Sequence, residues 1–259
     1  MMTVITKVHQ RMKGVFLGLV LMAVIPQAAQ SQVLIGILLG DKVTTENFHL
    51  GVDVGLGLSN ISGISGTNLK SGFHFGLLAE WRFAKGFYFQ PGLLPFYQVG
   101  AKDLPFKDFG LPPVDVVVTD KSAVRQLNYY AIPIIVKYGL LQEKLHLGLG
   151  PQVNILSSAK DVFDGTISND ISVTEDIKDQ LNSTDTGIAF HAEYKLRGRY
   201  GVSVTARFYL GMSDLIKDNR GEAAKNRVFS LMATIPIGGD PTKKDDEAEE
   251  PKADAGEGS

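Results

Sequence analysis

Ionisable side chains recur at alternate positions along this chain, where neighbouring segments could bring them together. Four histidines, His49, His74, His146 and His191, share the same polar faces. The charged members are three acids and four bases, namely Asp53, Glu80, Arg82, Lys137, Glu193, Lys195 and Arg207. Such a set is suited to a proton or ion path, or to a histidine ligand set for a metal. It is equally suited to a structural network of salt bridges, because a buried unpaired charge is costly. We favour the structural network.

The segments that carry these residues alternate bulky apolar side chains with small or polar ones. In residues 48–59 every even position is bulky and apolar, and every odd position is Gly, His, Asp or Ser. A period of two predicts a β-strand with two unlike faces. The same pattern recurs in eight segments, at 48–59, 71–83, 87–102, 126–138, 145–157, 186–196, 200–213 and 227–237. Strands of roughly ten residues are typical of transmembrane β-barrels.

The connections between these segments alternate between short and long. The short ones are 84–86, 139–144 and 197–199, and the long ones are 60–70, 103–125, 158–185 and 214–226. This layout predicts an all-β fold, an eight-stranded antiparallel up-and-down transmembrane β-barrel. An even strand count places both ends of the barrel on the short-turn side, the periplasm. At the third short turn we expect Leu196 to lie opposite Tyr200.

Aromatic residues flank all three short turns. They are Trp81, Phe83, Phe87, Phe89, Tyr138, Tyr194 and Tyr200. Aromatic rings of this kind concentrate at membrane interfaces. We therefore predict a periplasmic aromatic girdle, although aromatics are also common in strands generally.

The two ends of the chain differ from its middle. Residues 1–31 combine three basic residues, a short apolar run and Ala29-Gln30-Ser31, which predicts a cleaved signal peptide and an exported protein. Residues 32–45 form a lead segment, and 46–239 the barrel. Residues 240–259 carry eight acids and three bases, and we expect a disordered acidic periplasmic tail. No basic patch indicates nucleic acid, so the expected partners are outer-membrane lipid and a periplasmic or secretion-machinery protein.

Motifs for catalysis or cofactors are weak. The glycines of 51–57 and 148–150 resemble phosphate loops, but they alternate within strands, whereas a phosphate loop joins a strand to a helix. Ser203 and Ser213 share a face with His191, as a lipid-modifying barrel enzyme would require, but no orienting acid stands at a recognisable spacing. The chain has no cysteine. We expect no catalytic residue, no cofactor and no metal site.

Two features do not fit plain strands. Five prolines, Pro91, Pro95, Pro133, Pro151 and Pro236, fall inside predicted strands, and we expect bulges there because proline removes a ladder donor. In the loop 158–185, Ser172 and Glu175 form a capping-box pattern, and apolar residues follow at intervals of four. That spacing predicts a short amphipathic helix through Val173, Ile177 and Leu181.

The chain resembles the PorT-like outer-membrane β-barrel proteins typical of Bacteroidetes. The resemblance covers residues 46–238 and rests on GVDVGLGLS, FYFQPGLLPFYQVGA, YYAIPIIVKY and LHLGLGPQVN. It implies an eight-stranded barrel in the outer membrane. Most members of that family have no assigned activity, and one branch is associated with secretion and gliding machinery.

Three kinds of function remain open. The first is a structural or interaction barrel that presents four surface loops and the acidic tail. The second is a narrow transport barrel or a component of a secretion complex. The third is a soluble carrier of the lipocalin type, in which the apolar face would point inward around a ligand.

Overall fold

The computed structural model describes residues 45–105, 119–166, 170–196, 201–218 and 221–237. The predicted signal peptide, the lead segment up to residue 44 and the acidic tail lie outside these ranges. The barrel unit comprises Thr45–Pro236. Within the described ranges, no helix is both long and apolar enough to span a bilayer.

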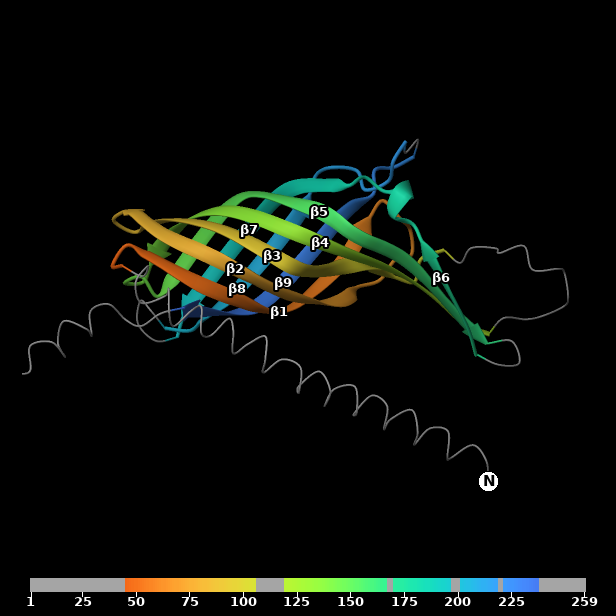
Figure 1. The fold of residues 1–259 in the computed structure, drawn as a ribbon, viewed down its shortest axis with the longest axis horizontal. Coiled ribbons are helices and arrows are strands. Elements are labelled where there is room, and N and C mark those ends of the chain that lie inside the picture. Colours follow the sequence, from red (N-terminus) through yellow and green to blue (C-terminus); the bar gives the residue numbers. More distant parts are fainter. Residues whose placement is uncertain (1–44, 106–118, 167–169, 197–200, 219–220, 238–259) are drawn as a thin grey trace, which may run out of the picture. The chain divides into compact units, whose positions relative to one another are not determined.

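Nine strands and one short 3₁₀ helix make up the described part of the chain (Figure 1). They are β1 (Phe48–Ser62), β2 (Lys70–Ala84), β3 (Phe87–Lys102), β4 (Thr119–Leu140), β5 (Leu145–Thr166), β6 (Asp170–Asp176), η1 (Lys178–Gln180), β7 (Thr184–Lys195), β8 (Ser203–Gly211) and β9 (Lys225–Ile237).

Eight of the strands close into a ring in the order β1-β2-β3-β4-β5-β7-β8-β9, with β9 returning to β1. The ring is antiparallel, and successive strands pair over most of their length; β4 and β5 pair from Leu140 and Leu145 at the turn up to Thr119 and Thr166. The predicted eight-stranded antiparallel barrel is therefore confirmed. Closure leaves the ring without an edge strand.

The two faces of the ring differ as the alternation predicts. On β1, Asp53 is 2% exposed, whereas Leu56 is 64% exposed. Bulky apolar side chains such as Leu77, Leu149 and Leu231 also point outward and are exposed. This arrangement is the reverse of a lipocalin, whose apolar face points inward.

Strand β6, which lies outside the ring of eight, shows that the sequence prediction for the loop 158–185 is wrong in one respect. Residues 170–176 do not form a helix: they pair with 160–166 of β5 as an extra strand outside the ring. The capping-box pattern does not produce a helix here, because Val173 and Thr174 are β-branched and their backbone pairs with β5 as an additional strand. Ile177 and Leu181, expected on one face of that helix, are buried beyond the end of β6.

The prolines are accommodated in two ways. At Pro95 the strand bulges: Leu94 pairs with Ala131, whereas Tyr97 pairs with Tyr129, so β3 holds one extra residue. The pairing continues in register across Pro91, Pro133 and Pro151. The predicted bulge is therefore confirmed at Pro95 and wrong at these other three positions.

The third short turn is longer than the sequence suggested. The Leu196 amide donates to the Val202 carbonyl at 3.0 Å, and Lys195 pairs with Ser203, so the expected pairing of Leu196 with Tyr200 is wrong by two residues. A shift of two keeps the same side chains facing inward, because side chains alternate with a period of two.

Candidate functional site

The lumen next to the short turns holds a cluster of four buried charges from three strands. Lys137 on β4 is ion-paired with Glu80 on β2 and with Glu193 on β7. Lys195, also on β7, places Nζ 3.2 Å from Glu80 Oε1. The free Glu193 oxygen, Oε1, accepts a hydrogen bond from Ser203 Oγ at 2.7 Å. Each carboxylate is thus ion-paired with at least one ammonium group, and all four side chains are buried.

This cluster spans the barrel. In the ring of eight, β2 and β7 are four strands apart, so they form opposite walls. The pair between Lys195 and Glu80 therefore crosses the full width of the lumen, and Lys137 joins the same two walls from the side. An eight-stranded barrel leaves room for side chains alone, so these contacts fill the cross-section at this level.

A second ion pair lies on β1 and β8. Arg207 Nη2 lies 3.2 Å from Asp53 Oδ2, and Thr234 Oγ1 donates to Asp53 Oδ1 at 2.6 Å. Thr205 in turn bonds to Thr234 at 2.9 Å between the two hydroxyl oxygens. This pair is buried, like the larger cluster.

Arg82 does not join the buried charges. Its Nη2 atom lies 3.2 Å from Glu143 Oε1, and both side chains are partly exposed. Arg82 therefore belongs to the rim at the short-turn end. Without it, the buried charges of the predicted set balance, with Asp53, Glu80 and Glu193 against Lys137, Lys195 and Arg207.

The four histidines lie on the lumen side, and two of them contact the carboxylates of the charged cluster. His49 Nε2 is 3.4 Å from Glu80 Oε1, and His191 Nε2 is 3.6 Å from Glu193 Oε2. His74 Nε2 contacts the Gln98 carbonyl at 3.1 Å, and His146 packs edge-on against Tyr88. In the described ranges, no group of three or more His, Cys, Asp or Glu side chains could hold a metal ion.

The two serines considered for catalysis bond to carboxylates. Ser203 Oγ donates to Glu193, and Ser213 Oγ donates to Asp185 Oδ1 at 3.1 Å. These bonds tie the hydroxyls to the acidic groups of the lumen and not to an imidazole. In a Ser–His nucleophile pair the hydroxyl would donate to an imidazole nitrogen instead.

Asp185 is a buried acid that the sequence did not indicate as a lumen residue. It is fully buried near the long-loop end and accepts four hydrogen bonds, from Tyr209 at 2.9 Å, Ser213 at 3.1 Å, Asn226 at 2.8 Å and Asn154 at 3.2 Å. These donors come from β5, β8, β9 and the loop after β8, so one carboxylate links three strands of the ring to β7. A period-two pattern identifies Asp185 only if the strand is known to begin at Thr184.

Above the charged cluster the lumen also contains an apolar cluster, which lies beside the Asp185 network and which the sequence did not predict. Buried tyrosines and aliphatic residues of the inner face form one cluster, including Leu94, Tyr97, Leu127, Tyr129 and Tyr209. Two connections add to the same cluster, one through Ile177 and Leu181 and the other through Leu215. The Asn182 amide donates to the Leu215 carbonyl at 2.8 Å, so the connections also bond to each other. Both connections therefore pack into the long-loop end of the lumen.

The aromatic residues beside the short turns point outward. Trp81, Phe83, Phe87, Tyr138 and Tyr194 are exposed, and Phe89 is partly buried. Tyr200 lies outside the described residues. The rings of Trp81, Phe83, Phe87 and Tyr138 follow one another across β2, β3 and β4, with centroids 6.3, 6.1 and 4.8 Å apart.

A closed ring of amphipathic strands with an apolar outside and a filled, polar inside defines a small membrane β-barrel. The family model described as "Outer membrane protein beta-barrel domain" matches residues 28–217. This chain therefore belongs to that family of outer-membrane barrels.

Solved structures of other barrels resemble it at low sequence identity. Ail, the attachment invasion locus protein of Yersinia pestis, is 13% identical, with a TM-score of 0.38 over 74% of this chain and 99% of that one. Neisserial surface protein A is 13% identical, with a TM-score of 0.36 over 74% and 97%. Acinetobacter baumannii CarO is 9% identical, with a TM-score of 0.35 over 70% and 96%. The comparison with curated proteins gives no significant match.

Proposed function

We propose that this protein is a closed outer-membrane barrel with a structural and interaction role, and that it is neither an enzyme nor an open pore. The observation that carries the proposal is the ion pair between Lys195 and Glu80, which joins opposite walls of the lumen. The apolar cluster and the two connections that pack into it support the same conclusion. A barrel of eight strands has little room left once such side chains are in place.

Solute flux tests this proposal. Vesicles that carry the purified, heat-modifiable barrel should admit small sugars no faster than protein-free vesicles, while vesicles with a general porin should swell rapidly. Rapid, protein-dependent swelling would favour the alternative, a narrow transport barrel or a component of a secretion complex.

We propose that the short turns face the periplasm and the long connections face the cell exterior. The row of outward aromatic rings beside the short turns supports this, since such rings suit a membrane interface. The three-stranded sheet formed by β4, β5 and β6 then extends from the outer rim. Protease added to intact cells should cut within 158–185 and spare the tail; a cut in the tail would reverse this orientation.

We propose that the acidic tail, residues 240–259, contacts a basic periplasmic partner. Its eight acids against three bases favour such a contact, which salt would screen beyond about 8 Å. Deleting 240–259 should leave the barrel folded and heat-modifiable and should reduce only the recovery of the partner from solubilised outer membrane. Failure of the shortened chain to assemble would show that the tail is part of the folding signal.

Within its family, we propose that the chain is of the PorT-like kind, and that residues 1–31 are removed on export. The four glycine-, proline- and aromatic-rich motifs support the first proposal, and the small residues before Gln32 support the second. Sequencing the amino terminus of the membrane-bound protein tests the cleavage, with Gln32 expected as the first residue. Isolation of the barrel with secretion-machinery proteins would place it in the secretion branch.

A further inference from the structure

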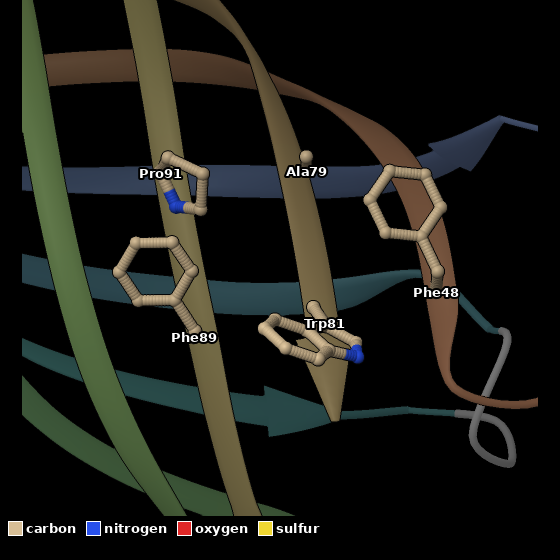
Figure 2. Close-up of a pocket in the computed structure, with 5 residues that line it drawn as sticks. All are labelled: Phe48, Ala79, Trp81, Phe89 and Pro91. Atoms are coloured by element: carbon tan, nitrogen blue, oxygen red, sulfur yellow. The ribbon is translucent and has the colours of Figure 1, made fainter. Parts of the chain in front are cut away.

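An apolar groove lies on the outward face of the barrel near the short turns. Phe48 of β1, Ala79 and Trp81 of β2, and Phe89 and Pro91 of β3 line it, and its volume is about 300 Å³. Figure 2 shows Ala79 between Phe48 on one side and Pro91 on the other, with the rings of Trp81 and Phe89 nearby. The groove is therefore walled by rings and open at the outer surface.

One small residue creates this groove. The outward positions of β2 are Phe73, Phe75, Leu77, Ala79, Trp81 and Phe83, so every neighbour of Ala79 in this row is bulky. The missing side-chain volume at Ala79 leaves a depression, because Phe48 and Pro91 on the adjacent strands do not lean in to fill it (Figure 2). A larger aliphatic residue at position 79 would remove the depression.

We propose that this groove binds one acyl chain of a phospholipid. It is continuous with the membrane-facing surface, since Leu77 and Leu93 on the same strands are exposed and apolar. Water in such a groove would find few hydrogen-bond partners, whereas a hydrocarbon chain would contact the rings on both sides. The exposed Lys85 lies in the turn that joins β2 to β3 and suits a phosphate headgroup.

The choice of a phospholipid rests on the orientation proposed above, which places the groove in the periplasmic leaflet. A headgroup near Lys85 would then lie at the membrane surface, and the acyl chain along Ala79 would point toward the membrane interior. Trp81 lies between these two levels, where an amphipathic indole is favoured.

Lipid retention tests the proposal in the folded, full-length barrel. Native mass spectrometry after detergent exchange should find one phosphatidylethanolamine retained by the wild type. Ala79→Leu should lower that retention roughly tenfold, because it fills the groove. Ala192→Leu is the matched control, since Ala192 is also a partly buried outward alanine near a short turn, on β7; it should retain lipid as the wild type does.

Fluorescence supplies a second readout. Trp81 is the single tryptophan of the chain, so its emission reports on the groove alone. At a low mole fraction of phosphatidylethanolamine with brominated tails, quenching should exceed that expected from random contact in the wild type and in Ala192→Leu, and fall to the random level in Ala79→Leu.

Four results would overturn the proposal: equal retention in both variants, random quenching in the wild type, retention of lipopolysaccharide in place of phospholipid, or a second copy of the chain in the groove. A barrel that is heat-modifiable and closed to solutes but retains no lipid would contradict the lipid-binding proposal and leave the proposed function intact. A barrel that conducts solutes would instead contradict the proposed function.

Discussion

Lys195 and Glu80 stand 115 residues apart in the chain, yet Lys195 Nζ lies 3.2 Å from Glu80 Oε1 across the width of the barrel. The pair joins β7 to β2, the strand four places away in the ring. Since Lys137 also binds Glu80 and Glu193, the three strands β2, β4 and β7 are tied through one buried cluster. The cluster makes the barrel a filled structure at its short-turn end.

Removing one charge from this cluster should be costly. Lys195→Met leaves the buried Glu80 carboxylate with fewer cationic partners, so it should lower the free energy of unfolding by about 3 kcal/mol. Glu80→Gln combined with Lys195→Met should cost less than the sum of the two single changes, because the two groups interact directly. Urea unfolding from lipid vesicles measures both effects.

Arg82→Gln is the control for this series. Arg82 pairs with Glu143 at the partly exposed rim, so its loss should cost no more than about 1 kcal/mol. Equal losses of unfolding free energy for Arg82→Gln and Lys195→Met would show that burial does not strengthen the ion pair of Lys195.

Val54 tests which face of β1 meets the membrane. It follows Asp53, which is buried in the lumen, and precedes a stretch in which Leu56 is exposed. Val54→Arg should cost roughly 2–4 kcal/mol near the middle of the membrane, whereas Leu196→Arg, next to a short turn, should cost at most about 1 kcal/mol. Spin labels at positions 52, 54 and 56 should report lipid; labels that report water would reverse the faces of β1.

Gly57 tests how tightly the lumen is packed. A Cβ atom on Gly57 would lie 2.2 Å from Cε1 of His74, whose ring is held by Tyr97 and by the Gln98 carbonyl. Gly57→Ala should therefore lower stability by about 1–3 kcal/mol through overpacking. The double change with His74→Ala frees the space and should recover part of the loss; no recovery would mean that the imidazole is not the obstacle.

The alternation of side chains predicted most of the barrel because it is local. Asp53, Glu80 and Lys137 fall on inward faces that can be read from single strands, and β3 has the predicted bounds. The partners of these residues were not predictable in the same way. A period of two gives the face of Glu80 but not the residue that lies opposite across the lumen, which depends on the ring order and on the stagger of every strand.

The sequence predictions were wrong or incomplete where two local patterns competed, or where the inward and outward faces of a strand were both apolar. Residues 172–176 carry a capping box and β-branched side chains at once, and only the presence of β5 beside them decides for a strand. The apolar cluster of the upper lumen was not predicted because some of its residues alternate with outward residues that are also apolar, as Tyr97 does with Phe96 and Tyr129 with Tyr130. Where both faces are apolar, the pattern no longer distinguishes inside from outside.

Single-channel recording tests the closed lumen most directly. The wild-type barrel, inserted in a planar bilayer and shown to be folded by its heat-modifiable migration, should give no stable conductance steps. Stable, large conductance steps from the wild-type protein would contradict the account.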